Sequence, residues 1–349
     1  MKLEWRVLPR TAIGSSLALI FVACCISNGV VEEYFSLPDF DEKIIAPEVV
    51  EFSPAVLDRY SSSLQVIGSS VFILSPRSAD KLVTCFDFET GDKEMFVSRG
   101  RGPQEILGID DLCVTDDAFY IYDTNERKIL RYARSVGNSL LFDSTLVLEN
   151  YYLHVIPTPD GRFLGLPMNN GRFSFISSDG DYMESRGSFL PVKGPRKAVN
   201  NRSLQTLVAF SPDGQHMCSA YKDADCIEFY DHDLNLTRRL MGPEGRIPEV
   251  VEVNRAGLHA YASTPNYKEF MGICAMEEGV YVGYVGYERK KGDPDRGLNS
   301  ILFFDWEGNC KIRYLLPFEL DAFDIDADNR LVGVTFDYEH PQLVRFPLP

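Results

Sequence analysis

The segment "GRGPQE", residues 100–105, has a glycine spacing that could cradle a phosphate group. In a dinucleotide-binding loop, G-x-G-x-x-G follows a strand and opens a helix whose N-terminus receives the pyrophosphate. Here Pro103 follows Gly102 at once, and Glu105 occupies the sixth position, where a carboxylate would repel phosphate. The next residues, "ILGIDDLCV", lack the 3.6-residue apolar period of a helix. We therefore interpret the segment as a turn between two β-elements.

Histidines and carboxylates are present, but their spacing does not define a catalytic or metal-binding set. The chain has five histidines that share no ligand spacing: His154, His216, His232, His259 and His340. Among them His154, in "YYLHVIP", lies on a strand-like run, and no G-x-S-x-G motif of a nucleophilic serine occurs. The sequence therefore predicts no catalytic residue, no metal site and no cofactor.

The segment "DIDADNR" places Asp324, Asp326 and Asp328 at alternating positions, as at the start of a calcium-binding EF-hand loop. Such a loop needs glycine at its sixth position and glutamate at its twelfth, but the chain has Asn329 and Thr335 there. The segment therefore predicts an ordinary β-turn.

Helical periodicity is almost absent after residue 30, and a repeat of short strands replaces it. An aromatic-rich strand, an acidic or polar turn and a second strand recur in "VTCFDFETGDKEMFV", "FYIYDTNERKILRYA", "FSFISSDGDYMESRG", "CIEFYDHDLNLTRRL" and "ILFFDWEGNCKIRYL", and "QLVRFPLP" resembles a truncated sixth copy. Most copies follow another hairpin, such as "HVIPTPDGRFLGLP" or "VAFSPDGQHMCSAY". We interpret each copy as the outer hairpin of a four-stranded unit of about 50 residues, which predicts an all-β fold, a six-bladed β-propeller. The early run "EVVEFSP", residues 48–54, is expected to supply the strand that the sixth unit lacks.

Segments rich in glycine and proline separate the units and are expected to cross one face of the disc. They are "GRGPQE", "VKGPRK", "MGPEGRIPE" and "LLPFEL". Proline cannot join a strand ladder and glycine permits a sharp reversal, so these segments fit the links from an outermost strand to the next innermost strand. We hypothesise that this linker face, which includes basic residues in an acidic protein, binds an anionic or glycan ligand or a partner protein. The candidate residues are Arg99, Arg101, Glu105, His154, Lys193, Arg196 and Arg246. The alternative is that they are solvated loop charges.

The amino terminus has the layout of a signal peptide. A basic start, "MKLEWRVLPR", precedes the apolar run "TAIGSSLALIFVA", which is short for a membrane span. The following "FVAC" resembles a bacterial lipobox in which Cys24 becomes the lipidated first residue, with Phe21 where leucine is usual. Ordinary secretion after Ala23 and an uncleaved anchor are the alternatives. The predicted division is a signal peptide over residues 1–23, a lipidated tether over 24–42 and the propeller over 43–349.

Six of the eight cysteines lie beyond the anchor and are scattered through apolar runs. Only Cys218 and Cys226 are close in sequence, and a four-residue hairpin loop between them would place Cys218 opposite Phe229. We therefore expect free, buried thiols and no disulfide.

The "GRGPxE" linker, the lipobox and the six-unit layout together resemble those of the TolB-like six-bladed β-propeller lipoproteins of Gram-negative anaerobes. The resemblance covers about residues 40–349. It implies the fold and an extracytoplasmic, membrane-anchored location, periplasmic or at the cell surface, but no agreed activity or catalytic residues.

The net charge of −16 argues against a nucleic-acid partner and against binding to an anionic membrane surface except through the lipid anchor. The predicted function is a binding or scaffolding module for an envelope protein, a peptide or a glycan. The alternative is a hydrolase or lyase with a site in the central channel, with or without a metal.

Overall fold

The computed structural model describes residues 26–27, 30–49, 63–75, 78–109, 111–115, 118–134, 140–168, 171–195, 198–255, 258–337 and 341–349. Almost all of the regular structure in this part of the chain is β-sheet, and the short 3-10 helix η1 (Leu37–Asp39) is the exception. No described helix has the length and the apolar character that crossing a bilayer requires.

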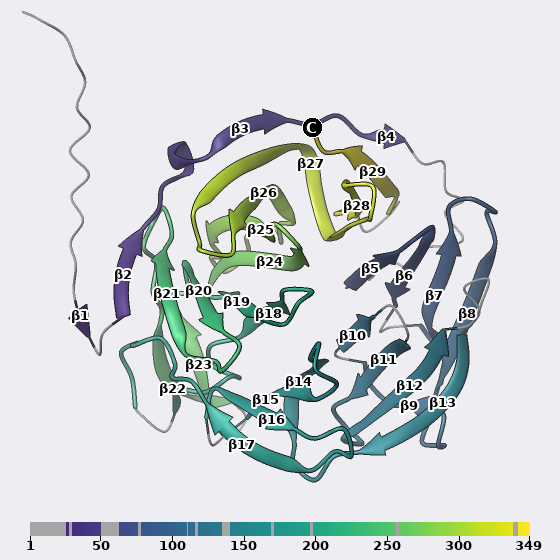
Figure 1. Cartoon of the computed structure of the whole chain (residues 1–349). Helices are drawn as coiled ribbons and strands as arrows, with labels where there is room; N and C mark the ends of the chain where they lie inside the picture. Colours follow the sequence, from purple (N-terminus) through teal and green to yellow (C-terminus); the bar gives the residue numbers. More distant parts are fainter. Residues whose placement is uncertain are drawn as a thin grey trace, which may run out of the picture.

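Six four-stranded units form a ring, the arrangement of a β-propeller (Figure 1). Blade 1 consists of β5 (Ser63–Ile67), β6 (Ser70–Leu74), β7 (Lys81–Asp87) and β8 (Lys93–Arg99). Blade 2 consists of β10 (Asp111–Val114), β11 (Ala118–Asp123), β12 (Lys128–Arg134) and β13 (Leu140–Val147). Blade 3 consists of β14 (Tyr152–Pro157), β15 (Phe163–Pro167), β16 (Phe173–Ile176) and β17 (Tyr182–Arg186). Blade 4 consists of β18 (Thr206–Phe210), β19 (His216–Tyr221), β20 (Cys226–Asp231) and β21 (Leu236–Met241). Blade 5 consists of β24 (Tyr267–Met276), β25 (Gly279–Glu288), β26 (Leu298–Asp305) and the first part of β27 (Cys310–Ile325). The sixth consists of the end of β27, β28 (Arg330–Thr335), β29 (Leu343–Pro347) and β4 (Glu48–Val49).

The hydrophobic core is divided among the junctions between successive blades. One cluster, around Phe72, Phe96 and Phe119, joins blades 1 and 2, and comparable clusters join every other neighbouring pair, including blade 6 to blade 1. Aromatic and β-branched side chains suit these junctions because they pack between two pleated sheets. The repeat of apolar strands in the sequence is therefore the repeat of these junctions.

The amino-terminal residues form a belt, Val30–Val49, on the outer rim of blades 4, 5 and 6 (Figure 1). Strand β2 (Val30–Tyr34) pairs in parallel with β21, β3 (Asp41–Ile44) pairs in parallel with β27, and β4 pairs antiparallel with β29. The prediction that the run starting at Glu48 completes the sixth unit is confirmed for Glu48 and Val49, and residues 50–54 lie outside the described part. Part of the segment that we assigned to a tether is thus paired with blades 4 and 5.

Two details of the repeat differ from the prediction. The hairpin "FYIYDTNERKILRYA" is the middle hairpin β11–β12, because β13 adds a further strand outside it. The expected linker at "LLPFEL" lies inside the continuous strand β27, which passes from blade 5 into blade 6. A proline is tolerated there because the ladder to β26 is already interrupted between Leu315 and Leu320.

The linker "MGPEGRIPE" leads into an extra hairpin, β22 (Glu249–Arg255) and β23 (Leu258–Thr264), before blade 5 begins. This hairpin rests on the linker between blades 3 and 4, where the Val250 amide donates to the Lys193 carbonyl at 2.8 Å. The other links run from an outermost strand to the next innermost strand. Because the strands of each blade alternate in direction, these links leave and enter on the same side of the ring.

The predicted arrangement of the cysteines is confirmed in part. Cys218 lies opposite Phe229, and Cys85, Cys218, Cys226, Cys274 and Cys310 are free thiols. The prediction that all six are buried is wrong for Cys85, Cys113 and Cys310, which are half-buried. Cys218, Cys226 and Cys274 are buried, and burial raises the pKa of each of these thiols.

Candidate functional site

The "GRGPQE" segment folds into a turn that its own glutamate fills. Glu105 turns back and its Oε2 accepts a hydrogen bond from the Gly102 amide at 2.9 Å. A Cβ atom at Gly100 would lie 2.0 Å from the same oxygen, so only glycine leaves room for the carboxylate. Blade 2 also contacts the turn, because Lys128 Nζ donates a hydrogen bond to the Gly102 carbonyl at 3.1 Å. The space in which a phosphate loop would hold an anion is thus occupied by a carboxylate, which agrees with the assignment of this segment as a turn.

The predicted basic linker residues lie where the links cross the ring, but internal partners engage their charges. Arg99 donates to two backbone carbonyls, those of Ser78 and Leu107. Arg101, with 77% of its side chain exposed, pairs with Glu126 at 3.1 Å, and Lys193 pairs with Glu249 at 3.3 Å. These contacts favour the alternative that the three side chains carry solvated or structural charges and do not bind a ligand. The candidate Arg196 lies outside the described residues, as does Cys24.

Arg246 belongs to a buried polar cluster between blades 4 and 5. Its Nε donates to Glu269 Oε1 at 2.6 Å, and Glu269 is fully buried at the start of β24. Burial raises the pKa of Glu269 to about 7, and nearby Asp225 acts in the same direction. Asp225 is itself held by the backbone amides of Glu244 and Gly245 at 2.8 and 3.0 Å. The cluster fixes the linker after blade 4 to the inner strand of blade 5, so we assign Arg246 a structural role.

In the described part of the chain, the inner strands do not bring together a recognisable metal site. His154 lies on β14, the inner strand of blade 3, and is half-buried. Within the described ranges, no group of three or more His, Cys, Asp or Glu residues could hold a metal ion. The "DIDADNR" segment forms the β27–β28 turn, in which Asp326 Oδ1 accepts from the amides of Asp328 and Arg330 at 3.0 and 2.9 Å. The aspartate pattern is therefore explained by the turn.

A pocket of about 720 Å³ lies at the junction of blades 2 and 3, beside the link from β13 to β14, and we call it the blade 2–3 pocket. Its volume falls within the range of small-molecule sites, about 300–1,000 Å³. The lining residues come from the link, from the start of β14, from the end of β15 and from the outer strands of blade 3: Glu149, Asn150, Tyr151, Tyr152, Pro167, Met168, Ser174, Tyr182 and Ser185.

Tyrosines dominate the lining of this pocket. Tyr151 and Tyr182 are 41% and 45% exposed, which is high for such large rings, whereas Tyr152 is almost fully buried. Burial raises the pKa of Tyr152, so its phenol stays protonated near neutral pH. Aromatic rings of this kind offer a rigid apolar surface and a polar tip, a combination common in binding sites.

One wall of the pocket carries a chain of hydroxyl groups. Ser174 and Ser185 lie opposite each other on β16 and β17, with their Oγ atoms 2.9 Å apart. The Tyr182 hydroxyl donates to Ser185 Oγ at 3.4 Å. Three hydroxyls provide three donors and six acceptor positions, and these two bonds use only part of that capacity. Ser174 is only 2% exposed, so Ser185 and Tyr182 are the hydroxyls of this wall that can reach a ligand, and they can do so without breaking the wall's own contacts.

No sequence motif predicted this pocket. Its residues are separated by up to 36 positions, from Glu149 to Ser185. The repeat copy "FSFISSDGDYMESRG" contains Ser174, Tyr182 and Ser185, but it predicts only that they lie on strands. A detectable signal was Tyr151, which directly follows the polar dipeptide at 149–150, because such a position in a link exposes an aromatic ring.

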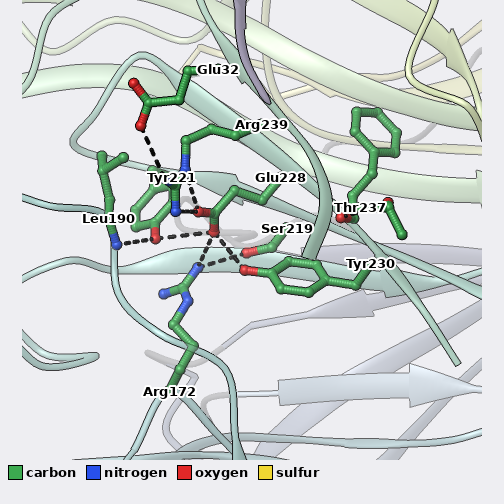
Figure 2. A network of polar contacts seen from close by, with 10 residues as sticks. Glu32, Arg172, Leu190, Ser219, Tyr221, Glu228, Tyr230, Thr237 and Arg239 are labelled. Atoms are coloured by element: carbon green, nitrogen blue, oxygen red, sulfur yellow. Dashed lines mark hydrogen bonds and ion pairs between the residues drawn. The ribbon is translucent and has the colours of Figure 1, made fainter. Parts of the chain in front are cut away.

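A second unforeseen feature is a buried charge network between blades 3 and 4 and the belt (Figure 2). Glu228, fully buried on β20, accepts hydrogen bonds from Arg239 at 2.7 and 2.9 Å and from Tyr230 at 2.7 Å. Arg172 reaches the same carboxylate from blade 3 at 3.3 Å. Arg239 also contacts Glu32 of the belt at 3.1 Å, so the network ties blade 3, blade 4 and the belt together. The burial of its central carboxylate indicates a structural role.

The fold is thus a six-bladed β-propeller with a pocket at one blade junction. The profile of the TolB-like 6-blade propeller-like family matches residues 39–328, more than half of the chain, and the chain belongs to this family. No curated protein matches the sequence.

Several solved structures are similar in fold. One is a Bacteroides fragilis protein whose name gives it as an expected exported protein. Its sequence is 11% identical to this chain, the TM-score is 0.55, and the match covers 90% of this chain and 97% of that chain. A member of the DUF4221 family from Bacteroides vulgatus shares 9% identity and a TM-score of 0.55, with 86% and 97% covered. Virginiamycin B lyase from Staphylococcus aureus shares 12% identity and a TM-score of 0.48, with 87% and 99% covered. At these identities the likeness concerns the fold alone.

Proposed function

We propose that this protein is a binding module of the cell envelope that receives its ligand in the blade 2–3 pocket. The observation that carries the proposal is the pocket itself, a cavity of about 720 Å³ in which two large aromatic side chains remain exposed beside a wall of hydroxyl groups. Exposed aromatic rings within a concave site are typical of recognition surfaces. The ring of blades supplies a rigid frame for such a site.

A ligand screen by thermal unfolding tests this proposal. A ligand that binds only the folded state raises the melting temperature by mass action. We expect Tyr151→Ala and Tyr182→Ala to reduce the shift caused by a bound glycan or peptide. Tyr34→Ala is the matched control, because Tyr34 is a 66% exposed tyrosine on β2, at the rim of blade 4. Equal shifts in all four proteins would place the ligand elsewhere and overturn the assignment of the pocket.

We also propose a lipid anchor at Cys24 and a periplasmic or cell-surface location. The signal-peptide layout and the "FVAC" segment support it. We expect Cys24→Ser to move the protein from the detergent phase to the aqueous phase on phase partition, whereas Cys25→Ser leaves it in the detergent phase. Partition of the Cys24→Ser protein into detergent would contradict the anchor. A channel hydrolase or lyase remains the alternative function, and turnover of a bound ligand in the screen would support it.

A further inference from the structure

We propose that the ligand class of the blade 2–3 pocket is an uncharged saccharide. This inference rests on the proposed function and specifies the chemistry of the same site. It follows from three properties of the described lining: its charge, its aromatic surfaces and its hydroxyl wall.

The charge of the lining disfavours anionic ligands. Among the nine described lining residues, Glu149 is the charged one, and it is acidic. Phosphate and carboxylate ligands are normally bound by arginine, lysine or a helix N-terminus. The net charge of −16 adds a long-range field that also opposes anions. A nucleotide, a phospholipid headgroup or a sulfated glycan therefore fits this site poorly.

The aromatic surfaces favour a ligand with flat apolar faces. Tyr151 and Tyr182 line the pocket and are 41% and 45% exposed, and Met168 and Pro167 extend the apolar lining. One face of a pyranose ring carries axial C–H groups and is apolar enough to stack on an aromatic ring. Tyrosine holds such a face at a small entropic cost, because it has only two side-chain torsions.

The hydroxyl wall favours a ligand that both donates and accepts hydrogen bonds at many positions. The groups of Ser174, Ser185 and Tyr182 form a short chain with unused capacity, and Asn150 and Glu149 add an amide and a carboxylate. A purely apolar ligand would bury these groups unsatisfied, which is costly. Sugar hydroxyls donate and accept in the same way as the wall does. An apolar face with a rim of hydroxyls describes a saccharide better than a peptide, whose main-chain groups need a strand-like partner.

An array of neutral oligosaccharides and extended decapeptides, followed by calorimetric titration of the hits, tests the inference on the chain from residue 26 onward. We expect neutral oligosaccharides to bind and both Tyr151→Ala and Tyr182→Ala to weaken them roughly tenfold. We expect Ser185→Ala to weaken them by a smaller factor, about threefold. Tyr182→Phe keeps the ring and loses the hydroxyl, so it separates stacking from hydrogen bonding, and Tyr34→Ala should change nothing.

The outcomes separate the two proposals. Peptide binding that depends on Tyr151 and Tyr182, with no saccharide binding, would overturn the saccharide class and leave the pocket as the binding site. Binding of neither class, or saccharide binding that all the pocket variants retain, would overturn both. Each variant is first checked for an unchanged melting temperature, and Tyr182→Phe and Ser185→Ala provide gentler substitutions if an alanine variant is unstable.

Discussion

At the scale of single residues, Glu228 is the most consequential charge in the molecule. It is fully buried, and it compensates Arg172 and Arg239 at once. We expect Glu228→Gln to lower the free energy of unfolding by about 3–5 kcal/mol, because both cations would lose their shared buried partner. Urea unfolding monitored by circular dichroism measures this change.

The matched control is Glu126→Gln. Glu126 also pairs with an arginine, but Arg101 is largely exposed, so water screens the pair. We expect little change in stability for this variant. Equal losses for Glu126→Gln and Glu228→Gln would contradict the structural role of the buried network.

Asp324 gives a prediction of pH dependence at the same scale. It lies on β27 in blade 6 and accepts the Val66 amide of blade 1 at 2.7 Å. Burial raises the pKa of its carboxyl group to about 6, above the value of about 3.9 in an unfolded chain. The folded state therefore binds the proton more tightly, and this contribution to stability is complete below pH 4 and is lost as pH rises through about 6.

We expect Asp324→Asn to remove this dependence, since the amide cannot ionise and its oxygen can still accept the Val66 amide. The difference in unfolding free energy between pH 4 and pH 7.5 should change by on the order of 3 kcal/mol relative to the unmodified protein. Denaturant titrations of both proteins at the two pH values measure it. Parallel pH profiles would show that Asp324 does not titrate in this window.

Individual residues were the least predictable part of the molecule. At Glu105 the exclusion of a phosphate was foreseen, because a carboxylate beside two glycines repels it, but Glu105 was also a candidate binding residue and its hydrogen bond to Gly102 was not predicted. Arg246 could not be assigned from its place in a linker, since its partner Glu269 is 23 positions away on another blade. The pocket tyrosines share this difficulty, because their importance depends on exposure within a concavity and not on a local pattern.

At the scale of elements, the belt stabilises the rim of the ring. Phe35 and Phe40 insert from the belt into the core between blades 4 and 5, where both rings contact Phe304 edge-on. We expect Phe40→Ala to lower the unfolding free energy by about 3–5 kcal/mol, the usual loss for a buried phenylalanine. Tyr34→Ala, at an exposed belt position, should cost less than about 0.5 kcal/mol. A small effect of Phe40→Ala in thermal or urea unfolding would mean that the belt only rests on the rim.

Strand repeats and turn residues predicted most of the blades, because alternating apolar residues and Asp-Gly or Asp-Asn turns act locally. The sequence could not show that β2 and β3 pair with blades 4 and 5, because these pairings join residues more than 200 positions apart. The continuity of β27 through Pro317 was missed for a related reason. A proline predicts a break in a strand, but here it falls where the strand changes neighbours.

At the scale of the whole molecule, the outer rim of the ring is uneven, because further strands cover the outer edges of some blades and not of others. The belt adds a fifth strand outside blades 4 and 5 and supplies the fourth strand of blade 6, and β9 (Glu105–Ile106) adds a short parallel strand to blade 1. In the described sheets, β13 and β17 end blades 2 and 3 with no further strand outside them, as the rim in Figure 1 also shows. Backbone amides at such edges have fewer protein partners and open more readily.

This asymmetry predicts how the molecule opens. Because β27 belongs to two blades and the belt spans three, blades 4, 5 and 6 should open together, whereas blades 2 and 3 can open locally at lower free energy. Hydrogen exchange followed by mass spectrometry should therefore show faster exchange in peptides covering β13 and β17 than in those covering β21 and β27. The blade 2–3 pocket lies in the faster-exchanging region, so a bound ligand should slow exchange there first. Equal protection of all four strands would mean that the interblade cores, and not the rim strands, set the stability of every blade.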